Sequence, residues 1–206
     1  MRAPAKLYLA SSNPGKLNEY RVLAENAGPS PVFSVELGLL PKFASLPEFE
    51  ESAPTFAENA AGKALHYSRL SNGLVFADDS GLVVPALGGA PGVHSARYAG
   101  ANATNSRRIE KLLSEMRGKV GGERFAHFVC AIALARKGRA LAVITDLVDG
   151  EILESPIGTG GFGYDPVFYF PALKKTFAEL SPEEKNQRSH RGKAFRKLIA
   201  ALSSML

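Results

Sequence analysis

The stretch LYLASSNPGKLNEYRVLAENA, residues 7–27, combines the local signals that decide the fold class. Residues 7–10 form a short apolar run that predicts a strand, and Pro14 and Gly15 then mark a turn. Apolar side chains recur at helical spacing after the turn, at Leu17, Tyr20, Leu23 and Ala27. A strand, a turn and a helix in this order predict the opening of an α/β fold.

Three further helical regions are predicted downstream. Thr55 and Glu58 form a capping box at the start of the first, residues 102–117 predict the second, and Ser181 with Pro182 opens the last. Their inward faces carry Phe56, Ala60, Ala64, Tyr67 and Leu70 in the first, Ile109, Leu112, Leu113 and Met116 in the second, and Phe195, Leu198, Ile199 and Leu202 in the last.

Extended segments separate these helices. Residues 73–77 predict a buried strand that ends on three polar residues, and residues 82–87 continue as a second extended stretch. Residues 125–135 and 140–148 predict a hairpin around Lys137-Gly138. Since no repeat or low-complexity linker interrupts the chain, we expect a single α/β domain over residues 1–206.

Composition narrows the classes of function. The 206 residues include 25 Lys and Arg against 20 Asp and Glu, and a net charge of +5 suits anionic ligands. No basic block or basic-aromatic tract is present, which disfavours nucleic acid as the ligand. The single cysteine, Cys130, excludes an intrachain disulfide and is predicted to pack in the core. Polar residues interrupt the apolar stretch of residues 1–16, so we expect a cytoplasmic protein.

Two segments offer groups that bind phosphate. In SSNPGK, residues 11–16, a turn precedes a helix start whose free backbone N–H groups attract anions, and Lys16 adds positive charge. An ordinary strand-to-helix turn explains this segment as well, because the full Walker pattern is absent. Asn59, Lys63 and His66 follow one another along a polar stripe of the helix after Thr55, so we expect them to line one cleft.

The segment FADDSG, residues 76–81, brings two adjacent carboxylates to the end of an apolar strand, where uncompensated charge is costly. Mg²⁺ prefers oxygen ligands, which matches Asp79 together with a nearby acid such as Glu51. Adjacent strand residues point to opposite faces, so Asp78 and Asp79 are predicted to have different roles. A simple Asp-Asp-Ser turn is the alternative.

The segment GTGGFGYDPVF, residues 158–168, has the composition of a loop that contacts a base. Its glycines permit close backbone approach, and Phe162 and Tyr164 offer flat faces. Asp165 could accept or orient a hydrogen bond. A glycine-rich hairpin with its aromatic rings packed into the core is the alternative.

The segment KNQRSHRGKAFRKL, residues 185–198, presents hydrogen-bond donors. Lys185, His190 and Arg191 could donate to phosphate or to a purine carbonyl. The 6-oxo group of a purine accepts such hydrogen bonds. The 6-amino group of adenine is itself a donor, so it would leave these donors unpaired. A solvated basic helix end is the alternative.

Five motifs occur together and in order: SSNPGK, TFAENAAGKA, FADDSGLVVPALGGAPGVHSARYAG, GTGGFGYDPVF and SHRGKAF. Together they closely resemble the inosine triphosphate pyrophosphatase family, the non-canonical purine nucleoside triphosphate pyrophosphatases, over residues 7 to about 198. The resemblance implies an elongated α/β fold with two lobes around a central cleft, a homodimer and Mg²⁺ dependence. It also implies release of pyrophosphate from ITP, dITP or XTP.

The resemblance assigns roles to individual residues. The triphosphate would be held by Ser11, Ser12, Asn13, Pro14, Gly15, Lys16 and Lys63. Glu51 and Asp79 would bind the metal, and Asp79 would also be the proton acceptor. The other substrate contacts would come from Ser80, Phe162, Gly163, Tyr164, Asp165, Lys185, His190 and Arg191. Glu48 and Glu50 lie beside Glu51 and are alternative metal ligands.

Two other functions stay open at this point. A related pyrophosphatase acting on pyrimidine nucleotides would share the phosphate and metal chemistry, although the SHR motif favours purines. A nucleotide-binding or RNA-binding regulator without turnover would suit the basic charge balance. The carboxylates Glu51 and Asp79 argue against the regulator, because a pure anion binder gains nothing from them unless a metal intervenes.

Overall fold

The computed structural model describes residues 5–26 and 35–205, and its described part contains a seven-stranded mixed sheet in the order β2-β1-β3-β4-β5-β6-β7. The strands are β1 (Ala5–Leu9), β2 (Val35–Leu39), β3 (Leu74–Val83), β4 (Phe125–Arg136), β5 (Arg139–Ile152), β6 (Phe168–Phe170) and β7 (Lys175–Thr176). β1 pairs in parallel with β2 and β3, and the remaining neighbours are antiparallel.

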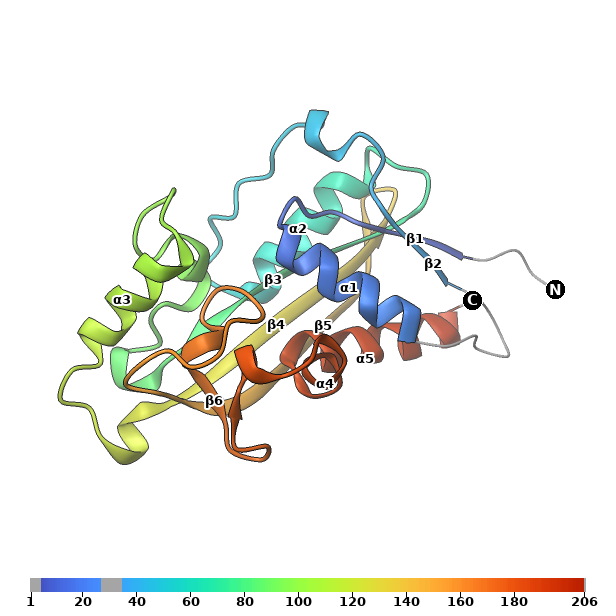
Figure 1. The fold of residues 1–206 in the computed structure, drawn as a ribbon. Helices are drawn as coiled ribbons and strands as arrows, with labels where there is room; N and C mark the ends of the chain where they lie inside the picture. The colour runs from blue at the N-terminus through green and yellow to red at the C-terminus, as the bar shows by residue number, and fades with distance from the viewer. Residues whose placement is uncertain (1–4, 27–34, 206) are drawn as a thin grey trace.

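Helices cover both faces of this sheet. They are α1 (Pro14–Asn26), α2 (Phe56–Ser68), α3 (Asn105–Glu115), α4 (Pro182–Arg188) and α5 (His190–Met205). α2 packs on one face, and α1 and α5 pack on the other. Figure 1 shows an elongated molecule in which the long strands β4 and β5 run from the end that carries α3 toward the end where β1 and β2 lie.

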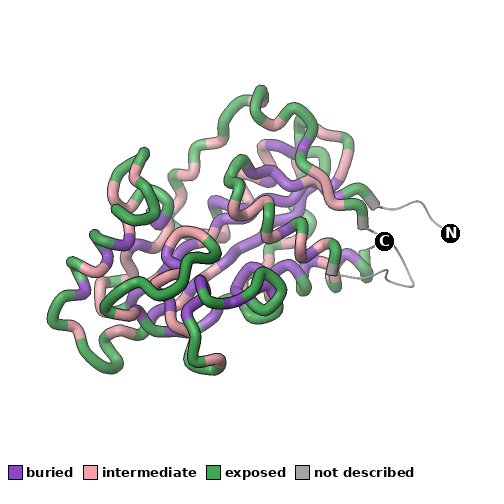
Figure 2. The backbone as a smooth tube through the Cα atoms, viewed as in Figure 1, coloured by how far each residue is buried: buried purple, intermediate pink, exposed green. Residues whose placement is uncertain are grey.

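The apolar side chains divide into clusters that define two lobes. One lobe holds a cluster on each face of the sheet, around Phe76 and Phe195 on the α1 and α5 side and around Ala64 and Val75 on the α2 side. The other lobe holds the cluster around Leu112 of α3, which packs with the strands β4 to β6. Figure 2 shows the buried backbone concentrated along the central strands. The predicted α/β fold with two lobes is therefore confirmed.

Several local predictions are confirmed. Lys137 (φ 50°) and Gly138 (φ 74°) form the two-residue turn between β4 and β5. The Thr55 side chain accepts a hydrogen bond from the backbone N–H of Glu58 at the start of α2, and Cys130 is buried in the core. None of the helices in the described ranges combines the length and apolar character needed to cross a membrane.

The prediction that β3 ends on its acidic residues is wrong. β3 continues through Asp78 and Asp79 to Val83, because its backbone pairs with β4 over this whole length, including Asp78 with Ile132. The strand that ends here is β1, whose last paired residue, Leu9, lies opposite Phe76. The acids therefore lie just beyond the end of β1, where a parallel neighbour no longer covers this edge of β3.

Other boundaries also differ from the predictions. The second extended stretch, residues 82–87, ends in a 3₁₀ turn at Pro85–Leu87. Leu70 is 49% exposed, because α2 ends at Ser68. The last helical region is two helices, since Ser189 adopts an extended conformation between α4 and α5. β2 has no counterpart among the predicted elements, and the predicted helix position Ala27 lies outside the described residues.

Candidate active site

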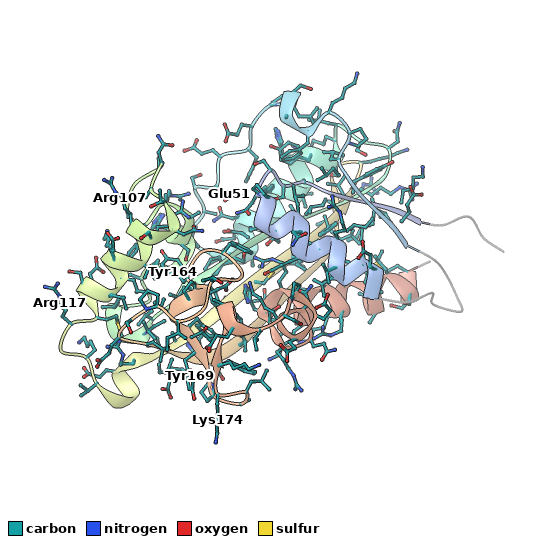
Figure 3. All side chains as sticks on the ribbon, viewed as in Figure 1. Glu51, Arg107, Arg117, Tyr164, Tyr169 and Lys174 are labelled. Atoms are coloured by element: carbon teal, nitrogen blue, oxygen red, sulfur yellow. The ribbon has the colours of Figure 1, made fainter. Side chains whose placement is uncertain are left out.

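A cavity of about 200 Å³ lies where the two lobes meet. Its lining includes Ser11, Ser12, Asn13, Lys16, Glu51, Lys63, Asp79, Ser80, Phe162, Gly163, Tyr164, Asp165, Lys185, His190 and Arg191. Figure 3 labels Glu51 and Tyr164 near the centre of the molecule, whereas Arg117 and Lys174 lie at its periphery. The structure thus brings together every residue to which the family resemblance assigned a role, except Pro14 and Gly15 at the start of α1. Of the predicted polar stripe on α2, Lys63 lines the cavity, whereas Asn59 and His66 do not.

The turn between β1 and α1 is capped by its own side chain. Asn13 Oδ1 accepts hydrogen bonds from the backbone N–H groups of Gly15 (2.9 Å) and Lys16 (3.2 Å), and the N–H of Asn13 donates to Ser11 Oγ. The prediction of free backbone N–H groups at this helix start is therefore wrong, because asparagine is a favoured N-cap and satisfies them locally. Lys16 and the serine hydroxyls remain as groups for an anion.

Gly15 acts through packing. A Cβ atom at this position would lie 2.6 Å from the ring of Phe162, so only glycine lets the ring rest against the turn. The Lys185 ammonium lies 4.9 Å from the centre of the same ring, and the Arg191 guanidinium lies 5.5 Å from it. Phe162 is thus held between the β1–α1 turn and two cations of the last helices.

Asp78 and Asp79 face opposite sides of the sheet, as predicted. Asp78 shares the side of Leu74 and Phe76, where α1 and α5 pack, and its carboxylate lies 3.1 Å from Lys16 Nζ and 3.5 Å from Arg191 Nε. Burial alone would raise the pKa of the Asp78 carboxyl, but Lys16 and Arg191 hold it below its ordinary value. Asp78 is therefore a buried anion that orients two cations of the cavity.

Asp79 shares the α2 side of the sheet with Val75 and Ala77. Its Oδ2 accepts a hydrogen bond from Asn59 Nδ2 at 3.0 Å, and its Oδ1 accepts one from the backbone N–H of Ser80. Burial raises the pKa of the Asp79 carboxyl to about 6, and the nearby charge of Glu51 acts in the same direction. A carboxyl with this pKa exchanges a proton near neutral pH.

Glu51 reaches the cavity from the loop before α2, and its Oε1 lies 2.5 Å from Lys63 Nζ. Burial alone would lower the pKa of the Lys63 ammonium, but Glu51 raises it above its ordinary value. Arg97 donates to the backbone carbonyl of Glu51 and fixes the loop from the other lobe. Glu48 and Glu50 are exposed and line only a more open neighbouring groove, so Glu51 is the acid of this segment that lines the cavity.

Lys185 and Arg191 are buried and paired. Lys185 Nζ lies 2.5 Å from both Glu19 and Asp165, and Arg191 binds Glu19 and donates to Ser80 Oγ at 2.7 Å. Burial alone would lower the pKa of Lys185, but Asp165 and Glu19 raise it. These pairs are expected, because a buried cation without a partner is costly. Both side chains line the cavity, so donation to a ligand stays a prediction.

His190 begins α5 and stacks on Phe128, with ring centres 4.8 Å apart and planes 10° apart. Burial, together with the charges of Arg191 and Lys185, lowers the pKa of this imidazole well below its ordinary value, so the ring is neutral. Its Nδ1 is buried and has no hydrogen-bond partner within the protein. The His190 ring lines the cavity, and a neutral imidazole carries one N–H donor and one acceptor nitrogen.

Two predicted cleft residues have structural roles instead. Tyr164 is buried in the core, where its hydroxyl donates to the backbone carbonyl of Ser95, so its ring is not an open face for a base. His66 lies outside the cavity, because its ring packs on Phe49 and its Nε2 contacts the carbonyl of Pro47. Phe162 is therefore the better placed of the two predicted aromatic residues to contact a base.

Comparisons with known proteins place this fold in a family. The model of the Ham1 family matches residues 7–201 of the chain. The chain belongs to the Ham1 family. This match covers the span on which the sequence motifs resembled the inosine triphosphate pyrophosphatases.

Individual Ham1-family relatives are similar over almost their whole length. A Geobacillus kaustophilus protein named dITP/XTP pyrophosphatase is 51% identical over 94% of this chain and 92% of its own. A Desulfotalea psychrophila protein of the same name is 44% identical over 94% of this chain and 83% of its own. The structure of a HAM1 protein from Coxiella burnetii superposes with a TM-score of 0.84, at 40% identity over 97% of this chain and 99% of that one. The resemblance inferred from the motifs is confirmed.

Some residues of this Ham1-family site were not predicted. Glu19 joins Lys185 to Arg191, and Arg97 and Arg108 line the cavity from the lobe of α3. Glu19 lies on α1 one turn after Lys16, so a search for polar residues at helical spacing would have found it. Arg97 lies within a quoted motif, but nothing in the local pattern indicates that its segment meets Glu51.

Proposed function

We propose that this Ham1-family chain hydrolyses non-canonical purine nucleoside triphosphates, such as ITP, dITP and XTP, to the nucleoside monophosphate and pyrophosphate. One observation carries the proposal: two carboxylates, Asp79 and Glu51, share a cavity with lysine and arginine side chains from both lobes. Cations suit the negative charge of a triphosphate, and the carboxylates suit a metal and a proton. The names of the relatives support the same substrate class.

The donor set fits a magnesium ion. Asp165 also lines the cavity, but its side chain is 3% exposed and its Oδ2 accepts from both Lys185 and the Phe162 N–H. Glu51 is 28% exposed and shares one oxygen with Lys63, so Asp79 and Glu51 are the acids better placed for a cation. Mg²⁺ commonly binds through one or two carboxylates together with substrate phosphates and water, which is the ligand set available here. When bound, the ion would neutralise phosphate charge and hold the phosphate oxygens beside the two carboxylates.

The side chains divide the remaining work. Lys16 and Lys63 would neutralise charge on the phosphates as it develops, since each ammonium has donors beyond those used by its present partner. Asp79, ionised above pH about 6, would accept a proton from the water that attacks the α-phosphorus. Pyrophosphate would then leave from the side of the cavity occupied by the lysines.

Base selection is assigned to the end of the cavity that holds Phe162 and His190. A neutral His190, which lines the cavity, would donate a ring N–H to the 6-oxo group of hypoxanthine or xanthine. The 6-amino group of adenine would leave this buried donor unpaired, at a cost of about 1–3 kcal/mol. This corresponds to roughly tenfold to hundredfold discrimination against ATP.

We also propose a homodimer and a cytoplasmic location. The family resemblance of the motifs supports the dimer.

The decisive experiment incubates the purified protein with ITP, XTP, GTP, ATP and dTTP, each with and without Mg²⁺, and identifies the phosphorus products by ³¹P NMR. We expect pyrophosphate and monophosphate from ITP and XTP, only in the presence of Mg²⁺, and at least about tenfold slower turnover of ATP.

Other outcomes would select other functions. Release of inorganic phosphate as the primary product would mean attack at the γ-phosphorus. Faster turnover of dTTP than of ITP would favour a pyrimidine nucleotide pyrophosphatase. Tight nucleotide binding without any product would favour a binding protein and would contradict the roles given to Asp79 and Glu51.

A further inference from the structure

Asn59 is a buried amide that touches both segments carrying the candidate metal ligands. It is 1% exposed and lies on α2, in the first turn and a half of the helix. Its Oδ1 accepts a hydrogen bond from the backbone N–H of Ala53 at 2.9 Å, and its Nδ2 donates to the Ala53 carbonyl at 3.2 Å. The same Nδ2 donates to Asp79 Oδ2 at 3.0 Å.

The two carboxylates differ in how firmly their backbones are held. Asp79 lies on β3, inside a ladder with β4. Glu51 lies in a loop with neither helix nor strand, two residues before Ala53. The pair of hydrogen bonds between Asn59 and Ala53 therefore fastens the Glu51 loop to α2, and the third bond fastens the same amide to Asp79.

The hydrogen bonds also orient the Asp79 carboxylate. An ionised carboxylate has about four acceptor positions, and Asn59 and the Ser80 N–H use one on each oxygen. The remaining positions are left for a cation, and the bond to Asn59 stops the carboxylate from rotating away from them. Groups that orient metal ligands in this way tune metal affinity.

We propose that Asn59 is a positioning residue that sets the separation and orientation of the Glu51 and Asp79 carboxylates before a divalent cation binds. This inference rests on the proposed function, because it takes these two carboxylates as the ligands. Asn59 itself does not touch the substrate or the cation. It acts through Ala53 and Asp79.

The test uses Asn59→Leu, which has the same branching and number of heavy atoms but is larger and has no hydrogen-bonding groups, and Asn59→Ser, which is smaller and retains a polar group. Binding of Mn²⁺ to the purified protein without nucleotide is titrated by electron paramagnetic resonance. We expect the Mn²⁺ dissociation constant to rise about 10- to 100-fold in both variants, the range found when partners of metal ligands are removed. The serine variant keeps the test valid should the leucine variant fold poorly.

Ser68→Ala is the matched control. Ser68 lies at the other end of α2, is fully buried, and uses its hydroxyl to donate to Leu65 and to accept from Gly138. The control removes buried hydrogen bonds from the same helix without touching the acids, so its Mn²⁺ dissociation constant should equal that of the parent protein. An equal loss of affinity in Ser68→Ala would reduce the role of Asn59 to general support of α2 and overturn the proposal.

Turnover of ITP supplies a second readout. In the Asn59 variants the Mg²⁺ concentration for half-maximal rate should rise, and kcat should largely recover at saturating Mg²⁺, because the reacting groups remain. Unchanged Mn²⁺ affinity in the Asn59 variants, or a parent protein that binds no Mn²⁺ without nucleotide, would overturn the inference. A parent protein that binds Mn²⁺ yet hydrolyses no ITP would instead refute the proposed function and leave the positioning role intact.

Discussion

The two halves of β3 share one backbone and have opposite chemistry. Leu74, Val75, Phe76 and Ala77 are apolar and pack between α2 on one face and α1 with α5 on the other. The next three residues, Asp78, Asp79 and Ser80, keep the same pairing with β4 but are polar, and Asp79 and Ser80 line the cavity. The strand continues across the change because its hydrogen bonds come from the backbone.

The difference shows how stability and function are separated along one strand. Each large apolar side chain that is fully buried in the first half contributes about 1.5–3 kcal/mol to folding. The acids of the second half are costly to bury and are tolerated because Lys16, Arg191 and Asn59 bind them. We therefore expect substitutions in the polar half to change turnover and substitutions in the apolar surroundings to change stability.

The largest effect is expected for Asp79→Asn. The amide has the same size, but it neither accepts a proton nor attracts a cation, so kcat for ITP should fall by about 10³-fold or more. Circular dichroism should show an unchanged fold, because the neighbouring packing is preserved. Near-normal hydrolysis by this variant would show that Asp79 is not a catalytic residue. It would also contradict the division of β3 into a structural half and a functional half.

Leu134→Ala is expected to have the converse effect: it should lower stability and leave turnover unchanged. Leu134 pairs with Phe76 in the apolar half and is fully buried. Truncation should cost about 3 kcal/mol through lost burial and a residual cavity, which for a chain of this size lowers the melting temperature by about 6–12 °C. Turnover of ITP well below the melting temperature should equal that of the parent protein. A large loss of kcat at such a temperature would show that the halves are coupled.

The smallest effect is expected from pH. Burial raises the pKa of Asp79 to about 6, and the protonated carboxyl can neither accept a second proton nor bind a cation. Activity should therefore be present above pH 6 and fall toward acid, by about tenfold for each pH unit below 6 at limiting Mg²⁺. Measuring kcat/KM between pH 4.5 and 8 in steps of about 0.5 checks this. The Leu134→Ala variant should have the same midpoint, and a shifted midpoint there would link the core to the Asp79 carboxyl.

Local signals in the sequence predicted most elements but misplaced some boundaries. The helix after Thr55 and the turn at Lys137-Gly138 follow from capping and turn preferences, which depend on a few neighbouring residues. The end of β3 was misplaced because a polar triplet was taken as a strand end, whereas pairing with β4 decides where the strand stops. β2 lies in a stretch of weak local signal, and its pairing with β1 defines it.

The sequence by itself determined the fold class, the family and most of the residues that line the cavity, because these follow from short patterns of spacing and residue type. Only the tertiary structure decided which charges meet: Glu19 with Lys185 and Arg191, and Asn59 with Ala53 and Asp79. Glu19 and Lys185 are 166 positions apart in the chain, and no local pattern encodes that distance. The physical reason is that the cost of a buried charge depends on its neighbours in space, so packing of distant segments selects the partners.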